Sequence, residues 1–536
     1  MKFIKFSLTP CAVLLWTSMG FGNPFHTAPA VQESNPVFHQ TFDHSKADWN
    51  RAKSDLEQLG RLQLSRLMTI FQPAYAEGIK GKALDLSSKA PVRSPIVMEK
   101  NDQIAYSPKQ SFALVVWVKT RPGARQGTPI WTNKQHNTPD SVGWTLGTQD
   151  NGAWLWNMSD GKVSYNYKPT AEKQAINDGK WHQLAISVDR TRKEVWMYLD
   201  GRNVAIYQIE NDNLQSLESK YRTILGGSDE KFDFESNGEW TAFNGYLDEA
   251  ALYDRPLTVA EVRKNYEQLS GHTLPEIRLT PDRLKIQVWN IWHGGHRFGE
   301  NVGVERTIEI LKENNADIIG LIETYGSGAI IADSLGYYFY LISTNLSIMS
   351  RYPIEETISL YKPFNSGGAI INLGKDKRIA FFDMWLSWRG ETERLVDINQ
   401  ILPPLEQYIK DSDRLPLIVV GDFNTTTHQD LTEDTQSLYK SVRQDRPVSE
   451  LITKAGLMDS YRVVHPNPAM SPGYTWSPIT NEIAALKKGF RSSRIDYIYY
   501  KSNRLLPYHS YVVDTHPVFY PSDHASVVTF FYLNWD

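Results

Sequence analysis

A group of acidic, amide and imidazole side chains in the second half of the chain has the residue types of a catalytic site. Each lies next to an apolar run that predicts a β-strand. Polar groups at the ends of buried strands gather at a sheet edge, where binding sites form. Carboxylate oxygens bind hard cations, and histidine exchanges protons near neutral pH. The residues are Asn290, Glu323, Asp422, Asn424, Asp496, Asp523 and His524.

Each of these clusters also has a structural explanation, and taken alone that explanation is favoured. Asn290 could bridge a turn, and Glu323 could pair with an arginine. Residues 421–424 (GDFN) could form a plain turn, and residues 522–524 (SDH) could cap a helix. Only the combination of clusters, in their order along the chain, makes the catalytic interpretation specific.

The elements that must position these groups alternate between strands and helices. Strands are expected at 285–289, 317–322, 346–350, 369–373, 379–386 and 415–420, and an amphipathic helix is expected at 304–312. This alternation predicts an α/β domain.

Together, the motifs VWNIW, LIET, SIMSRYPI, IVVGDFN, RIDYIYY and YPSDH resemble the endonuclease/exonuclease/phosphatase superfamily. The resemblance covers residues 283–536. It implies an α/β four-layer sandwich, in which two packed β-sheets are flanked by helices. It also implies metal-dependent hydrolysis of phosphodiesters at one edge of the sheets.

The resemblance implies a metal site for Mg²⁺ or Mn²⁺. Glu323 is expected to bind the ion, with Asn290 beside it, and Asp523 is expected to bind or position the ion through water. A hard cation neutralises an anionic phosphodiester and polarises its P–O bonds.

The remaining residues are expected to act on water and phosphate. Asp422 accepts a proton from the attacking water, and Asn424 donates a hydrogen bond to a phosphate oxygen. His524 donates a hydrogen bond or a proton to the developing oxyanion, and Asp496 orients it. The group that protonates the leaving oxygen stays open.

The sequence departs from the family pattern near this site. Trp292 stands where many members have an acidic residue, and Trp385 stands where a phosphate-binding His or Tyr is expected. Trp385 and His293 are therefore candidate substrate contacts, although His293 could equally belong to an ordinary polar loop. Arg494 could contact phosphate or simply pair with a neighbouring residue.

The first half of the chain has the pattern of a β-sandwich. Short apolar runs alternate with turns such as Asp200-Gly201, which predicts an all-β jelly roll. The segments GKALDL, DGKWH, YLDG and FNGYLDE resemble laminin-G-like, concanavalin-type domains over residues 35–270. The resemblance implies glycan or protein binding, sometimes with Ca²⁺. No calcium-ligand cluster is evident, and a turn-capping role is favoured for Asp248.

The N-terminus and the composition set the remaining expectations. Residues 1–22 carry Lys2 and Lys5 before an apolar run, which predicts a signal peptide and a secreted or periplasmic protein. The only cysteine, Cys11, lies in that segment. Residues 271–282 contain two prolines and predict a linker. A net charge of −4 excludes a global basic field.

These observations lead to a secreted, metal-dependent phosphodiesterase with an N-terminal binding module. Its substrate could be nucleic acid, a phospholipid or a small phosphodiester. A basic run at residues 487–494 would suit nucleic acid, but a solvated loop is the commoner explanation of such a run. The alternative is an extracellular adhesion protein whose hydrolase domain is weak or inactive.

Overall fold

A computed structural model describes residues 35–43, 74–90, 95–98, 106–135, 138–209, 214–228, 243–275, 282–435, 445–479 and 492–535. The predicted signal peptide at 1–22 and most of the basic run at 487–494 lie outside the described residues. So does the middle of the predicted linker at 271–282.

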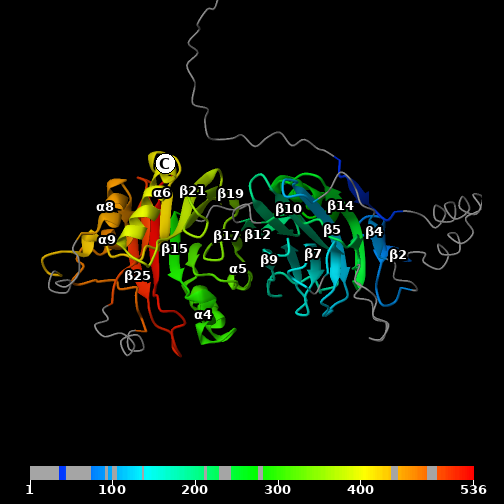
Figure 1. Cartoon of the computed structure of the whole chain (residues 1–536), viewed down its shortest axis with the longest axis horizontal. Helices are drawn as coiled ribbons and strands as arrows, with labels where there is room; N and C mark the ends of the chain where they lie inside the picture. The colour runs from blue at the N-terminus through cyan, green and yellow to red at the C-terminus, as the bar shows by residue number, and fades with distance from the viewer. Residues whose placement is uncertain are drawn as a thin grey trace, which may run out of the picture. The chain divides into compact units, whose positions relative to one another are not determined.

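The N-terminal half consists of two β-sheets, as the jelly-roll prediction requires (Figure 1). The strands of the first sheet are β1 (Phe38–Gln40), β2 (Ala74–Glu77), β3 (Lys82–Asp85), β5 (Phe112–Thr120), β10 (His182–Asp189), β11 (Glu194–Leu199), β12 (Arg202–Gln208) and β14 (Gly245–Tyr253). The strands of the second are β4 (Ile96–Met98), β6 (Pro129–Thr132), β7 (Gly143–Thr148), β8 (Trp154–Ser159), β9 (Ser164–Tyr167) and β13 (Thr223–Leu225).

Tryptophan side chains form much of the core of this sandwich. Trp131, Trp144 and Trp156 are buried, and the rings of Trp144 and Trp156 stack with centroids 5.7 Å apart. Asp248 is buried on β14, where its carboxylate accepts hydrogen bonds from the backbone N–H groups of Lys80 and Glu249. These contacts support the structural role favoured for Asp248.

Helix α3 (Val259–Ser270) follows the sandwich. Thr258 and Glu261 form a reciprocal capping box at its start. Gly271 ends the helix with φ of 70°, a conformation that glycine adopts without steric cost.

The C-terminal half contains two further groups of strands packed face to face, which confirms the α/β sandwich prediction. One group consists of β15 (Arg283–Asn290), β16 (Ile318–Ile322), β17 (Tyr338–Leu341), β18 (Leu346–Ser350), β25 (Leu505–Val513) and β26 (Ser526–Leu533). The other consists of β19 (Ile354–Ser359), β20 (Ser366–Gly374), β21 (Lys377–Trp385), β22 (Leu417–Asp422), β23 (Met458–Asp459) and β24 (Asp496–Lys501).

Alternating side chains on these strands explain the layers. On β15, Ile286 and Val288 join the core between the two groups of strands, whereas Trp289 faces the opposite side, where α4 and α5 pack. The first group is also connected to the N-terminal half, because β17 pairs in parallel with β12 from Ala205↔Phe339 to Tyr207↔Leu341.

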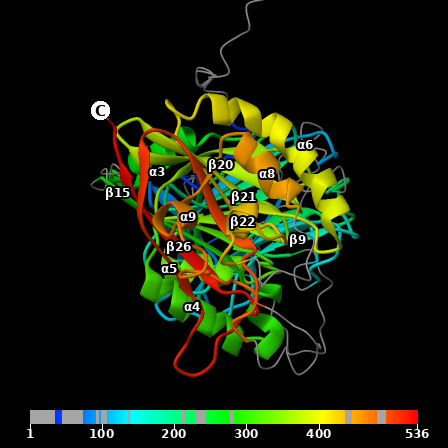
Figure 2. The same cartoon turned by 90° about the vertical axis from the view of Figure 1, so that its left-hand side faces the viewer.

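Helices cover the outer faces of the C-terminal strands. Figure 2 shows α6 and α8 lying along β20, β21 and β22, against which their apolar side chains pack. The helices and short 3-10 turns are α4 (Val302–Asn314), α5 (Gly328–Leu335), α6 (Glu391–Lys410), α8 (Pro447–Lys454), α9 (Ser460–Val464), η2 (His293–Phe298) and η3 (His428–Asp430). Among the described residues, no helix combines the length and hydropathy needed to cross a membrane.

Candidate active site

Strands from both groups end at one edge of the C-terminal sandwich and bring three of the predicted site residues together. The Nδ2 atom of Asn290, the last residue of β15, lies 3.3 Å from Glu323 Oε1 and 3.1 Å from Asp422 Oδ2. Glu323 directly follows β16 and has φ of 58°, whereas Asp422 ends β22. One amide therefore links two carboxylates that lie 99 residues apart on different strands.

The turn after β22 positions Asp422. Its Oδ1 accepts the backbone N–H of Asn424 at 2.9 Å, and its Oδ2 accepts the Asn424 side-chain amide at 3.1 Å. The same amide also donates to the carbonyl of Leu386 at 2.9 Å. Both amide protons of Asn424 are used within the chain, so the predicted phosphate contact would require the release of one of them.

His524 lies between two carboxylates. Its Nδ1 is 2.9 Å from Asp496 Oδ2, and its Nε2 is 3.9 Å from Asp422 Oδ2. Burial lowers the pKa of His524, but the charges of Asp496 and Asp422 outweigh burial and raise the pKa well above its usual value. Burial raises the pKa of Asp422, and the charge of His524 opposes that effect. The imidazole is therefore positively charged near neutral pH.

The carboxylates of the site fit a hard divalent cation. Asp523 Oδ1 and Asp496 Oδ1 are buried and accept no hydrogen bond from the part of the chain that the structure describes. Burial raises the pKa of Asp523; the charge of His524 lowers it, and the charge of Glu323 raises it. Buried carboxylate oxygens without donors are suitable ligands for Mg²⁺ or Mn²⁺.

The tightest group of ligand atoms among the described residues is a different set. Atoms of Asp422, Asp496 and His524 all lie within 4.8 Å of one another. The hydrogen bond between Asp496 and His524 accounts for part of that proximity and uses His524 Nδ1. The predicted ligand set of Glu323, Asn290 and Asp523 therefore stays a prediction.

Two of the predicted substrate contacts lie at the rim of the site. Trp385 ends β21 directly beside Asp422 in the parallel pair β21–β22, and its ring meets Phe364 edge-on at 5.5 Å. His293 is exposed, stacks on Tyr325 at 5.2 Å, and donates its backbone N–H to Glu323 Oε2 at 2.9 Å.

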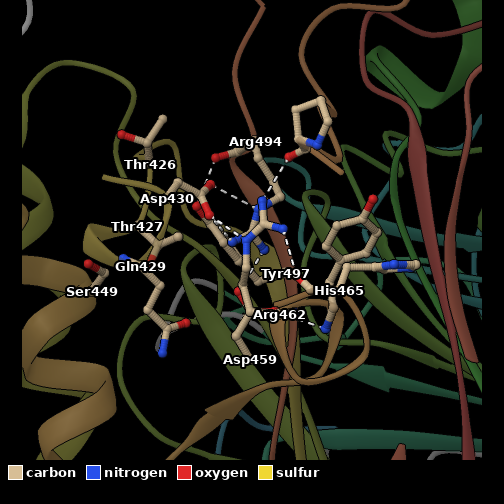
Figure 3. A network of polar contacts seen from close by, with 12 residues as sticks. Thr426, Thr427, Gln429, Asp430, Ser449, Asp459, Arg462, His465, Arg494 and Tyr497 are labelled. Atoms are coloured by element: carbon tan, nitrogen blue, oxygen red, sulfur yellow. Dashed lines mark hydrogen bonds and ion pairs between the residues drawn. The ribbon is translucent and has the colours of Figure 1, made fainter. Parts of the chain in front are cut away.

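Arg494 is buried in a network of charges (Figure 3). Its guanidinium donates two hydrogen bonds to Asp430, at 2.8 and 3.1 Å, and one to Asp459 at 2.6 Å. Arg462 donates to the same Asp430 at 2.6 Å. Burial raises the pKa of Asp430, but the two arginines outweigh burial and lower it. Of the two interpretations that the sequence left open for Arg494, this geometry favours pairing within the chain, and the partners are two carboxylates.

Sequence reasoning missed the residues that support the site from behind. The hydroxyl of Ser522 donates to the carbonyl of Asn290 at 2.6 Å, and the indole N–H of Trp289 donates to the carbonyl of His524 at 2.7 Å. Thr475 Oγ1 accepts the backbone N–H of Asp496 at 3.2 Å. Ser522 and Trp289 carried a local signal, because they belong to the SDH and VWNIW motifs.

Comparisons with known proteins find one family match in each half of the chain. Residues 99–263 match the concanavalin A-like lectin/glucanases superfamily, and residues 288–524 match the Endonuclease/Exonuclease/phosphatase family. Both matches agree with the resemblances seen in the motifs.

Individual relatives are distant. The chain is 23% identical to the uncharacterized protein F14F9.5 of Caenorhabditis elegans over 46% of its length and 91% of that protein. It is 26% identical to the non-toxic nonhemagglutinin type C of Clostridium botulinum C phage, over 38% of this chain but only 16% of that protein.

Solved structures similar to this chain include an AP endonuclease and a TDP2 protein. An AP endonuclease from Archaeoglobus fulgidus is 20% identical, with a TM-score of 0.36, over 46% of this chain and 99% of that one. Truncated Caenorhabditis elegans TDP2 is 16% identical, with a TM-score of 0.35, over 48% of this chain and 100% of that one.

Proposed function

We propose that this chain is a divalent-metal-dependent phosphodiesterase. Its C-terminal part matches the Endonuclease/Exonuclease/phosphatase family, and its N-terminal part matches the concanavalin A-like superfamily. The family supports phosphodiester hydrolysis as the reaction class. One observation carries the proposal for this chain. The Asn290 amide joins Glu323 to Asp422 at the edge where His524 is held by Asp496.

The side chains of the site divide the work of hydrolysis. A divalent cation, when bound, would neutralise the phosphodiester and polarise its P–O bonds. Asp422 is held by amide donors from Asn290 and Asn424, so its carboxylate is oriented to receive a proton from water. His524 is positively charged and presents Nε2 toward Asp422, so it can donate to an oxygen that gains negative charge.

Asp496 acts through His524 rather than on substrate. Its hydrogen bond to Nδ1 fixes the imidazole orientation and stabilises the charged form. The backbone of Asp496 is in turn held by Thr475, and Arg494 is anchored two residues earlier. Asp496 is therefore a positioning residue in this account.

Secretion and binding by the N-terminal half complete the proposal. The charged start and the apolar run of residues 1–22 support export, and the concanavalin A-like match supports a glycan or protein ligand. Export is tested by sequencing the N-terminus of the protein recovered outside the cytoplasm, where cleavage near residue 22 is expected and an intact Met1 contradicts it.

A substrate panel tests the catalytic proposal. The full chain is incubated with DNA, RNA, sphingomyelin and bis(p-nitrophenyl) phosphate, each with Mg²⁺, with Mn²⁺ or with a chelator. Turnover of at least one phosphodiester that the chelator abolishes is expected. Absence of turnover on all of them contradicts the proposal and favours the adhesion alternative.

Calorimetric titration with Mn²⁺ tests the metal site separately. Glu323→Gln removes a charge while keeping the shape of the side chain, and it is expected to weaken Mn²⁺ binding by about 10-fold or more. Glu309→Gln is the matched control, because Glu309 pairs with Arg306 on the exposed side of α4. Equal Mn²⁺ affinity in wild type and Glu323→Gln contradicts the assigned ligand.

A further inference from the structure

The loop that follows β15 carries aromatic side chains close in sequence to the candidate site residues. The rings of Trp292 and Phe298 meet edge-on with centroids 6.0 Å apart, and Phe298 packs against Phe519 at 4.8 Å. Trp292 comes two residues after Asn290, whereas Phe519 comes four residues before Asp523. The three rings, here named the aromatic shelf, therefore connect the two loops that border the site.

Backbone hydrogen bonds hold this loop against the candidate metal residues. The N–H of Trp292 donates to Asn290 Oδ1 at 3.0 Å, and the N–H groups of His293 and Gly294 donate to Glu323 Oε2 and to the Glu323 carbonyl at 2.9 and 2.6 Å. The position of the shelf is thus tied to the position of Glu323.

The backbone of the loop is strained where the shelf begins. Trp292 and His293 have φ of 52° and 55°, a region that costs a non-glycine residue about 1 kcal/mol or more. Gly294 and Gly295 continue the left-handed conformation at φ of 68° and 79° without that cost. Such strain concentrates at functional sites, because surrounding contacts must maintain it.

The positive charge of Arg297 lies on the shelf. The Arg297 guanidinium lies 5.3 Å from the centre of the Trp292 ring, and its NH2 group contacts His293 Nε2 at 2.9 Å. Arg297 is exposed, and no carboxylate of the described residues forms an ion pair with it. An anionic phosphate complements the charge of Arg297. An apolar or planar group attached to that phosphate would complement the neighbouring aromatic faces.

The exposure of Phe298 also indicates a ligand. Its side chain is 40% exposed although it contacts two other aromatic rings. An exposed ring within an ordered aromatic cluster provides a stacking surface for planar groups.

We propose that the aromatic shelf binds a planar aromatic group attached to the scissile phosphate, a nucleobase or an aryl ester, while Arg297 contacts phosphate. This inference rests on the proposed phosphodiesterase function and specifies its substrate class. It gives Trp292 a binding role at a position where an acidic residue is common in the family.

Phe298→Ala tests the shelf, and Tyr532→Ala is the matched control. Tyr532 is 39% exposed and also stacks on another ring, that of Tyr508, at 4.1 Å. It lies near the end of β26, whereas the site lies at the start of that strand. The substrates are dithymidine monophosphate, its analogue with both bases removed, and bis(p-nitrophenyl) phosphate.

The ratio of kcat/KM for the base-containing substrate to that for the abasic analogue is the readout. Phe298→Ala is expected to lower this ratio by about 5- to 150-fold, mainly through KM, and Tyr532→Ala is expected to leave it unchanged. If Phe298→Ala instead lowers kcat/KM for bis(p-nitrophenyl) phosphate relative to the abasic analogue, the shelf binds aryl esters, and this result also supports the proposal. If Phe298→Ala lowers kcat/KM for neither aromatic substrate more than for the abasic analogue, the shelf is not a substrate site.

Calorimetry separates this inference from the proposed activity. Thymidine 5′-monophosphate is expected to bind wild type more tightly than 2-deoxyribose 5-phosphate does, and Phe298→Ala is expected to remove that preference, whether or not any substrate turns over. Arg297→Gln is expected to weaken both ligands, because both carry phosphate. Equal affinity of wild type for the two ligands overturns the aromatic shelf, and full affinity in Arg297→Gln overturns the phosphate contact.

Discussion

Replacement of Arg494 by methionine is expected to destabilise the C-terminal domain strongly. Methionine fills a similar volume but removes the charge and the three hydrogen bonds to Asp430 and Asp459. Asp430 retains Arg462 as a partner at 2.6 Å, so its charge stays compensated. Asp459 loses the only cation that pairs with it among the described residues, and its side chain is 1% exposed.

The size of this destabilisation follows from the Asp459 carboxylate, which loses its cationic partner. Removal of one partner from a buried ion pair costs about 3–5 kcal/mol, because the remaining charge is left in a medium of low polarity. Asp459→Asn in the Arg494→Met background removes the charge and is expected to restore about 1–3 kcal/mol. In wild type the same Asp459→Asn change is expected to destabilise, because it removes a partner of Arg494.

Urea unfolding followed by tryptophan fluorescence measures these free energies. Lys410→Met is the matched control, since Lys410 pairs with Glu406 at 2.8 Å on the surface, where the two side chains are 71% and 59% exposed. It is expected to cost less than about 1 kcal/mol. The reasoning is refuted if Arg494→Met costs no more than Lys410→Met, or if Asp459→Asn is equally destabilising with and without Arg494.

Two further changes test other parts of the structure. Gly421→Ala is expected to lower the free energy of unfolding by about 1–3 kcal/mol or more, because the added Cβ would lie 2.1 Å from the backbone oxygen of Met384. Unchanged urea unfolding would contradict the close approach of β21 and β22. Burial lowers the pKa of His182, but the carboxylates of Asp200 and Asp178 outweigh burial and raise the pKa above 6.5. The contribution of His182 to stability is therefore complete below pH 6.5 and is lost as the pH rises through the raised pKa. The difference in unfolding free energy between wild type and His182→Gln is therefore expected to be larger at a pH of about 5.5 than at about 9, and a difference that grows with pH would contradict the ion pairs.

Local sequence signals were sufficient for the strands that carry the site. Residues 417–420 form a continuous apolar run followed by Gly421 and Asp422, so both the buried strand and its polar end can be recognised without tertiary information. The same holds for Asn290, which ends the apolar strand β15.

Long-range packing determined what the sequence could not show. Arg494 meets Asp430 and Asp459 across 64 and 35 residues of chain, so neither its burial nor its partners follow from its neighbours in sequence. Trp292 could be recognised only as a departure from a family pattern. Trp292 packs on Phe298 across a loop in which Trp292 itself has a left-handed backbone conformation. Phe298 in turn contacts Phe519, which lies more than 200 residues later in the chain.

Hydrolysis of a phosphodiester by Asp422→Asn and wild type, each with Mg²⁺ and with a chelator, tests the catalytic account most directly. Asn preserves the size of the side chain but cannot accept a proton, so kcat is expected to fall by about 10²- to 10⁴-fold. Asp376→Asn, an exposed change in the turn between β20 and β21 at φ of 61°, is the matched control and is expected to retain wild-type kcat. Wild-type kcat in Asp422→Asn, or hydrolysis that the chelator does not reduce, would contradict the assignment of this site as a metal-dependent phosphodiesterase.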